Sequence, residues 1–123
     1  MIGIDIVSIK RFEKFLEKKS ALSKYLSDEE ILLVTSSSTA AGFFATKEAV
    51  SKALGTGIGA KCSFKDIKIH KDTQGAPFYT LASKIIEEFD IIETSLSISH
   101  DSGFAIAVCV INTKKVLSRP LSH

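Results

Sequence analysis

The sequence predicts an α+β domain, a small antiparallel sheet with helices packed on it. Strand-forming runs lie near both ends of the chain, at residues 2–7 and 104–111. Residues 40–54 are rich in alanine and contain no proline, which favours a helix. The sequence Asp101-Ser102-Gly103 supplies a turn between a strand at 94–99 and the strand at 104–111, so these two strands should pair antiparallel.

The first half of the chain should contain one strand followed by three helices. Asp5 lies at the centre of strand 2–7, where a carboxylate needs an ion partner, hydrogen bonds or a metal. Ser8 can cap a following helix, because the apolar residues between 9 and 16 follow helical spacing. Ser27 and Glu30 form a capping box for a short helix to about residue 34. A hydroxyl from 35–39 should cap the long helix, which ends at Gly55.

The second half should contain two hairpins separated by a short helix. Residues 63–81 predict the first hairpin, with turn chemistry at 72–75, and residues 82–89 predict the helix. In strand 94–99, serines alternate with Leu96 and Ile98, so one face should be buried. Strand 104–111 is almost entirely apolar, which predicts a central strand covered on both faces. We expect the polar and basic tail 113–123 to be poorly ordered.

The length of 123 residues and the hydrophobic fraction of 45% fit one domain with some apolar surface left for an interface. The longest apolar run has eight residues, against the ~20 that span a bilayer, and the chain starts without a signal peptide. We therefore expect a soluble, cytoplasmic protein without a membrane partner. Cys62 and Cys109 are too few for a disulfide scaffold and should be reduced.

The faces of the long helix carry different chemistry. One arc is apolar and should face the core: Phe43, Ala49, Val50, Ala53 and Leu54. The opposite arc is polar: Lys47, Glu48, Ser51 and Lys52. Phe44 projects into this polar arc, so the arc should meet another subunit or a ligand. Glu48 and Lys52 could also form a simple surface pair, because they are four residues apart.

Basic residues gather in the segment 10–24. It holds six basic residues against two acidic ones, although the whole chain carries a net charge of only +2. Such a patch suggests an acidic partner, and a solvated helix face is the alternative. Nucleic acid is a weaker interpretation, because few aromatic residues lie between the basic ones.

Three blocks of the sequence resemble one known family. They are GIDIV followed by Arg11, the run FFATKEAVSKALGTGIG from Phe43 to Gly59, and SISHDSGFAIAVCV from Ser97 to Val110. In this order they closely resemble the holo-acyl-carrier-protein synthases, the small single-copy 4′-phosphopantetheinyl transferases. The resemblance implies that family's fold over residues 1–112 and a homotrimer with sites between subunits. It also implies transfer of 4′-phosphopantetheine from coenzyme A to apo-acyl carrier protein, for fatty acid biosynthesis.

The resemblance further implies roles for individual residues. Asp5 and Glu48 would bind Mg²⁺, which takes hard oxygen ligands from one or two carboxylates plus substrate phosphates. Glu48 could also accept the serine proton, directly or through a metal-bound water, and Lys52 would neutralise phosphate charge. The expected substrate contacts are Lys52, His100 and the backbone amides of Gly55, Thr56 and Gly57. The expected contacts to the carrier protein are Arg11, Lys14 and Lys18, which should form one stripe.

The sequence departs from the family at Phe43, where an arginine is usual. Lys47, Lys61 or Lys65 would then have to hold the phosphates of the nucleotide. His100 could equally be a structural histidine. The rival interpretation is a non-catalytic module whose basic helix binds an acidic protein or RNA, with Asp5 and Glu48 in structural roles.

Overall fold

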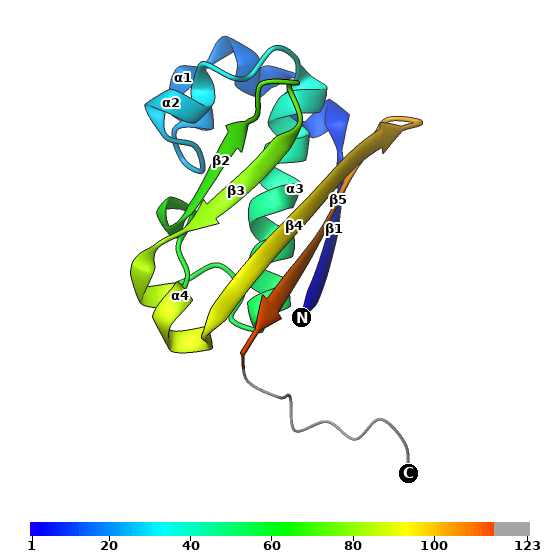
Figure 1. The fold of residues 1–123 in the computed structure, drawn as a ribbon. Helices are drawn as coiled ribbons and strands as arrows, with labels where there is room; N and C mark the ends of the chain where they lie inside the picture. Colours follow the sequence, from blue (N-terminus) through cyan, green and yellow to red (C-terminus); the bar gives the residue numbers. More distant parts are fainter. Residues whose placement is uncertain (115–123) are drawn as a thin grey trace.

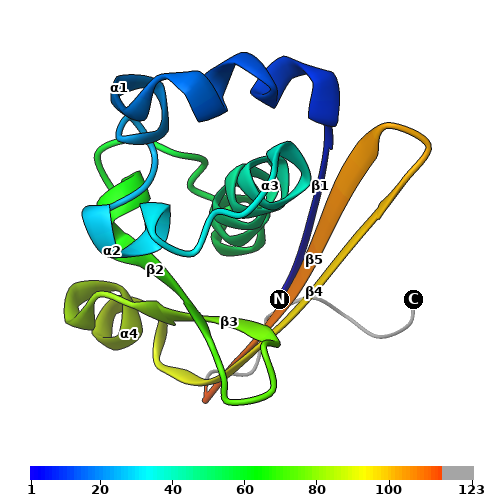
Figure 2. The same ribbon diagram turned by 90° about the horizontal axis from the view of Figure 1, so that it is seen from above.

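The computed structural model describes residues 1–114, which form one layered α+β unit around a long central helix. The strands are β1 (Ile2–Ser8), β2 (Ile67–Lys71), β3 (Pro77–Leu81), β4 (Ile91–Asp101) and β5 (Phe104–Thr113). The α-helices are α1 (Lys19–Leu22), α2 (Asp28–Ile31), α3 (Ser37–Leu54) and α4 (Ser83–Phe89). Helix α3 lies between the sheet β1-β5-β4 on one side and the hairpin β2–β3 on the other (Figures 1 and 2).

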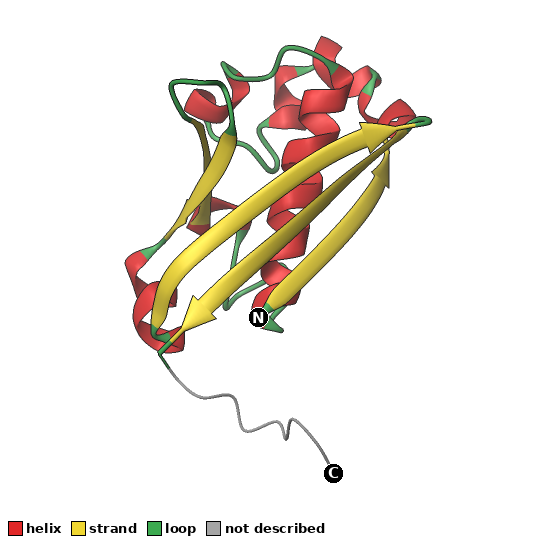
Figure 3. Ribbon diagram, turned by 45° about the vertical axis from the view of Figure 1, so that its right-hand side comes forward, coloured by secondary structure: helices red, strands yellow, loops and turns green. Residues whose placement is uncertain are grey.

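The three-stranded sheet is antiparallel throughout, and β5 is its central strand (Figure 3). In the register, Asp5 of β1 lies opposite Ala107, and Ile98 of β4 lies opposite the same alanine from the other side. The predicted turn joins β4 to β5, with Ser102 and Gly103 at φ angles of 52° and 84°. The predicted pairing of these two strands is confirmed.

Helix α3 begins and ends as the sequence predicts. The Ser36 hydroxyl accepts a hydrogen bond from the Thr39 amide at 3.2 Å and caps the helix. Gly55 ends it in the left-handed conformation at φ 77°, which costs glycine little. The predicted apolar arc is buried and forms the centre of the core. The capping box at Ser27 and Glu30 is also present, although α2 ends earlier than predicted, at Ile31.

The predicted polar arc of α3 is partly wrong, because Lys47 and Ser51 are buried. Lys47 forms an ion pair with Glu30, with 2.8 Å between Nζ and Oε1, and also donates to the Phe64 carbonyl. The second Glu30 oxygen accepts from the Ile69 amide at 2.8 Å. Each buried charge therefore has partners, and the pair joins α2 and α3 to the hairpin β2–β3.

The predicted helix after Ser8 is also wrong. Residues Ile9–Phe12 and Lys14–Glu17 form two 3₁₀ turns, α1 follows at Lys19, and the Ser8 side chain caps nothing. A 3₁₀ turn aligns residues three apart, so Phe12 and Phe15 project to the same side. Their rings are in contact, with centroids 5.1 Å apart.

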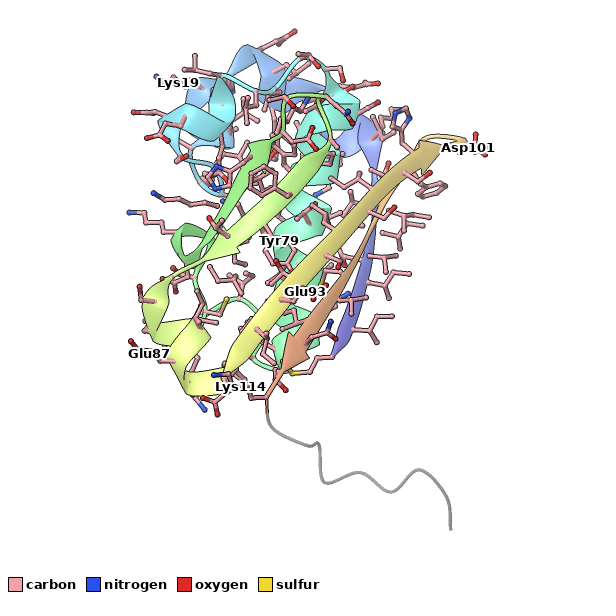
Figure 4. The ribbon with its side chains drawn as sticks, in the orientation of Figure 1. Lys19, Tyr79, Glu87, Glu93, Asp101 and Lys114 are labelled. Carbon is pink, nitrogen blue, oxygen red and sulfur yellow. The ribbon has the colours of Figure 1, made fainter. Side chains whose placement is uncertain are left out.

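Strand β5 is central as predicted, but within one chain it is covered on one face only. Its inward residues Ala105, Ala107, Cys109 and Ile111 are buried against α3. Phe104 and Val110, on the other face, are 47% and 36% exposed. The outward side chains of β1 and β5 point away from the helix (Figure 4).

The remaining predictions are mixed. The first hairpin and helix α4 are confirmed, β4 is longer than predicted, and its serines alternate with half-buried Leu96 and Ile98. Both cysteines are free and buried. Strand β5 extends to Thr113, and residues 115–123 of the predicted tail lie outside the described part of the chain. None of the helices in residues 1–114 has the length and apolar character needed to cross a membrane.

Candidate functional site

A glycine brings the first strand unusually close to the central helix. A Cβ atom on Gly3 would lie 1.9 Å from the Ala49 carbonyl oxygen and 2.8 Å from the Ala53 amide nitrogen. No other residue type fits this contact without moving the strand. The close approach places Asp5, two residues further along β1, against the polar side of α3. Sequence reasoning missed this role of Gly3, because a glycine in a strand indicates close backbone approach without naming the partner.

Asp5 forms an ion pair with Lys52, 47 residues away. The Asp5 Oδ1 atom lies 2.7 Å from Lys52 Nζ, and the two side chains are 13% and 54% exposed. Lys52 also donates to the Ile4 carbonyl at 3.4 Å. The simple surface pair of Glu48 with Lys52 is not formed in this structure; the lysine pairs with Asp5 instead. The cost of burying an isolated carboxylate correctly predicted that Asp5 has a partner.

The carboxyl group of Glu48 faces the same site. Burial raises the pKa of Glu48 above its ordinary value, and the neighbouring Asp5 carboxylate raises it further. The charges of Lys52 and Arg11 act in the opposite direction and lower this pKa. The structure therefore brings Asp5, Glu48 and Lys52 together, with Arg11 within electrostatic range.

The pair of carboxylates has the right chemistry for Mg²⁺, which prefers hard oxygen donors and is usually held by one or two carboxylates plus substrate phosphates. In residues 1–114, no group of three or more histidine, cysteine, aspartate or glutamate side chains could hold a metal ion. Asp5 and Glu48 would supply two ligands, and they fit an ion that completes its shell with water and phosphate oxygens.

The glycine-spaced loop does not offer free amides to a phosphate. The amide of Gly55 donates to the Lys52 carbonyl, and those of Thr56 and Gly57 donate to the Ser51 carbonyl, at 3.0–3.2 Å. These bonds satisfy carbonyls at the end of α3. The loop also lies at the negative end of the helix dipole, which disfavours an anion. The predicted anion-binding role of these amides does not agree with this geometry.

His100 borders a hollow of about 250 Å³ between α3, the β2–β3 turn and β4. The histidine is exposed near the tip of the β4–β5 hairpin, and Ile98 places β4 beside Gly42 of α3. Sequence reasoning missed the other polar residues that line the hollow, which are Ser36, Ser38, Thr39 and Lys71. Among these, only the positive charge of Lys71 could have suggested an anionic ligand from the sequence. A histidine, a cation and hydroxyl groups together suit a polar anionic ligand.

Arg11 lies on the aromatic ring of Phe44. Its Cζ atom is 4.9 Å from the Phe44 ring centroid and 5.4 Å from that of Phe12. The Phe44 ring also packs against Tyr25 and Phe64. Phe44 thus has ring partners within its own chain and remains half-buried, and the expected contact of the polar arc with another subunit or a ligand stays a prediction. Lys14 and Lys18 are exposed on the adjoining segment.

The structure also explains why this chain has Phe43 at the position where the family usually has an arginine. Phe43 is 2% exposed in the core, so a ring suits this position. Of the three proposed replacements, Lys47 is excluded because it is buried against Glu30. Lys61 and Lys65 are both exposed and remain open.

Comparisons with known proteins agree with this arrangement. The family model described as the 4′-phosphopantetheinyl transferase superfamily matches residues 1–109. The holo-[acyl-carrier-protein] synthase of Nautilia profundicola is 56% identical over 113 residues, covering 90% of this chain and 98% of the relative. That of Wolinella succinogenes is 50% identical over 117 residues, covering 94% and 99%.

Two crystal structures extend the likeness to the fold. The Helicobacter pylori holo-[acyl-carrier-protein] synthase in complex with coenzyme A has a TM-score of 0.86 and 54% identity, covering 91% of this chain and all of that one. The Bacillus anthracis holo-(acyl-carrier-protein) synthase, in complex with coenzyme A (3′,5′-ADP), has a TM-score of 0.76 and 37% identity. The match covers 92% of this chain and 96% of that structure.

Proposed function

The chain belongs to the 4′-phosphopantetheinyl transferase superfamily as a holo-[acyl-carrier-protein] synthase, and on that premise we propose a Mg²⁺-dependent reaction at Asp5, Glu48 and Lys52. The reaction moves 4′-phosphopantetheine from coenzyme A to a serine of apo-acyl carrier protein and releases adenosine 3′,5′-bisphosphate. The observation that carries the assignment is the Asp5–Lys52 contact beside Glu48, which unites two sequence motifs. A non-catalytic module is not retained, because the relatives are transferases.

The three residues have complementary roles in this proposal. Asp5 and Glu48 would hold the Mg²⁺, and the ion would supply charge neutralisation at the pyrophosphate. Lys52 is 54% exposed, so its ammonium can leave Asp5 and bind a phosphate oxygen. Phosphoryl transfer depends mainly on such positioning and charge stabilisation, because the protein has little covalent chemistry to perform.

The chemical step exchanges one phosphorus–oxygen bond for another. The serine oxygen of the carrier attacks the phosphorus nearer to pantetheine, and the bond from that phosphorus to the bridging oxygen breaks. The bridging oxygen leaves with adenosine 3′,5′-bisphosphate. The serine proton would pass to Glu48, directly or through water.

The hollow beside His100 is the proposed site for the nucleotide part of coenzyme A. Its lining combines His100, Lys71 and the hydroxyls of Ser36 and Thr39, which can donate to phosphate oxygens. In the register, Asp5 of β1 and Ile98 of β4 lie on either side of Ala107 of β5, so the hollow and the carboxylate site are two strands apart on the same sheet. The two related structures are complexes with coenzyme A, which supports a coenzyme A site in the family.

Arg11, Lys14 and Lys18 form the proposed dock for the carrier protein, and we call these three residues the basic dock. All three are exposed, and the charge of Arg11 lowers the pKa of Glu48. Exposed charge pairs act mainly on the rate of encounter and are screened by salt. Higher ionic strength should therefore raise the KM for carrier protein and leave the KM for coenzyme A nearly unchanged. Fatty acid biosynthesis in the cytoplasm is the proposed setting.

We further propose a homotrimer that uses the outer face of the sheet. Ile2, Ile4 and Ile6 of β1 are 70%, 59% and 57% exposed, and they lie opposite Val110, Val108 and Ile106 of β5. A continuous apolar face of this kind marks an interaction surface. A second copy would cover it, and the number three comes from the resemblance to the family.

The direct test is the mass of apo-acyl carrier protein after incubation with this protein, coenzyme A and Mg²⁺. We expect a gain of one phosphopantetheine on the serine and an equal yield of adenosine 3′,5′-bisphosphate. Omission of Mg²⁺ in the presence of EDTA should abolish the gain, and Mg²⁺ should restore it. Transfer that persists in EDTA would overturn the metal assignment, and absence of transfer with Mg²⁺ would overturn the proposed function.

A further inference from the structure

Phe44 lies in an aromatic cluster beside the carboxylate site. Its ring centroid is 5.4 Å from that of Phe12, 5.3 Å from Tyr25 and 6.0 Å from Phe64. Packing on several sides fixes the ring, although Phe44 remains half-buried and one of its faces carries Arg11. The cluster thus leaves one aromatic face of Phe44 in contact with a cation.

The rings are the only close partners of the Arg11 side chain within residues 1–114, where its guanidinium makes no hydrogen bond or ion pair. An arginine on the surface normally samples many rotamers, so binding a partner costs it conformational entropy. The two aromatic faces at 4.9 and 5.4 Å restrict this freedom while leaving the N–H groups available.

The position of this restricted charge relates it to the reaction site. Phe44 and Glu48 are four residues apart on α3, so their side chains lie on the same face of the helix, one turn from each other. The Arg11 guanidinium lies over the Phe44 ring, which places this cation about one helical turn from Glu48.

We infer that Phe44 is a positioning residue, whose ring holds the Arg11 guanidinium ready to receive an acidic group of the carrier protein beside the reacting serine. The inference rests on the proposed function. It adds that Phe44 acts through Arg11, so that the ring contributes to the binding of carrier protein and not to that of coenzyme A. Preorganisation of this kind lowers the entropy lost on binding.

The test is a double-mutant cycle between Phe44→Leu and Arg11→Gln, read as KM for carrier protein. A cation–π contact at a partly exposed site corresponds to about a two- to fivefold change in an equilibrium constant. We expect Phe44→Leu to raise this KM by about that factor and to leave kcat and the KM for coenzyme A unchanged. In the Arg11→Gln background the same substitution should have no further effect, because coupled residues are not additive.

Two variants separate the ring's effect on Arg11 from its effect on packing. Phe44→Tyr keeps an aromatic face and should keep the KM of the unmutated protein. Phe64→Leu removes another ring of the same cluster, one that does not contact Arg11, and should lower the melting temperature without changing the KM. All variants are first compared by thermal unfolding.

Three outcomes would overturn the inference. The first is an unchanged KM in Phe44→Leu, and the second is an increase of equal size in the Arg11→Gln background, which would indicate direct contact between the ring and the carrier. The third is a loss confined to kcat or to coenzyme A. Failure of the proposed function is distinguished from these outcomes, because the unmutated protein would then transfer no phosphopantetheine.

Discussion

At the scale of single residues, the site depends on charges that compete for the same partners. Asp5 binds Lys52 in this structure, while its charge also disfavours ionisation of Glu48 nearby. The site thus holds two carboxylates, the Lys52 ammonium and, within electrostatic range, the Arg11 guanidinium. A cation between the carboxylates and a phosphate on the lysine would satisfy all three groups.

Removal of either carboxylate should abolish most of the activity. We expect Asp5→Asn and Glu48→Gln each to lower kcat by about 10²- to 10³-fold, the range found when one electrostatic contact to a developing charge is lost. Transfer to apo-acyl carrier protein at saturating Mg²⁺ is the measurement. Glu29→Gln, which changes an exposed carboxylate of α2, is the control and should keep the rate. A rate close to the control in either site variant would contradict the assignment.

Glu48 should lower the free energy of unfolding at neutral pH relative to acid pH. Its pKa is raised in the folded state, so the folded protein binds the proton more tightly than the unfolded chain does. The stabilisation from this group is complete below the unfolded pKa and is lost as pH rises through the folded value.

The non-ionisable variant Glu48→Gln escapes this loss. With EDTA present, its melting temperature should therefore rise relative to that of the unmutated protein as pH increases from the acid range to 7. If the melting temperature of Glu48→Gln minus that of the unmutated protein stays constant or falls across this range, the raised pKa of Glu48 is contradicted. Mg²⁺ should reduce the difference, because the ion favours the charged carboxylate.

At the scale of elements, the contact between β1 and α3 assembles the site. Gly3 permits the strand to touch the helix backbone, and the register with β5 then sets the position of Asp5. Lys47, the neighbour of Glu48, faces the other way and pairs with Glu30 of α2. The helix is thus fixed to the sheet on one side and to α2 and β2 on the other, with its site residues between.

Substitution of Gly3 should separate these elements. The Cβ of Gly3→Ala would meet the Ala49 carbonyl at 1.9 Å, and backbone atoms cannot move aside as a flexible side chain can. We expect the free energy of unfolding to fall by about 1–3 kcal/mol or more, as in other overpacked cores, together with a loss of transfer. Urea denaturation measures the first and the mass assay the second.

A matched control exists in the loop after α3. A Cβ on Gly59 would meet nothing within 4 Å, and the backbone there is not left-handed, so Gly59→Ala should be nearly neutral. If Gly3→Ala were as stable as Gly59→Ala, the close approach of β1 to α3 would not determine the geometry of the site.

The elements also show how far a sequence can be interpreted. Helix α3, its caps and both hairpins follow from local signals: alanine content, a serine hydroxyl, glycines and turn residues. The partner of Asp5 and the burial of Lys47 depend on residues distant in the chain, which periodicity cannot reveal. The predicted helix after Ser8 is wrong, because the chain forms two 3₁₀ turns there, and apolar residues three apart do not distinguish such turns from an α-helix.

At the scale of the whole molecule, the sheet has one face that its own chain does not cover. The inner face packs on α3, while the outer face carries isoleucines and valines along β1 and β5 and a row of serines along β4. The apolar run of β5 led to the expectation of cover on both faces. That expectation fails for a single chain, and it agrees with the proposed assembly, in which another copy supplies the missing cover.

A charge on this outer face should therefore prevent assembly. Ile4, which is 59% exposed on the edge strand, points away from α3, so Ile4→Glu changes the outer face without entering the core. We expect the unmutated protein to have the mass of three chains by light scattering and the variant to have the mass of one, because an interface cannot bury an unpaired carboxylate cheaply.

Leu32→Glu provides the matched control, because Leu32 is an 84% exposed apolar residue that lies after α2, away from the sheet. It should leave the mass unchanged. An unmutated protein that is monomeric and active would contradict the trimer. A variant Ile4→Glu that remains trimeric would assign the interface to another surface. If the variant is a folded monomer without activity, the site needs residues from a second copy, as the family resemblance, with its sites between subunits, implies.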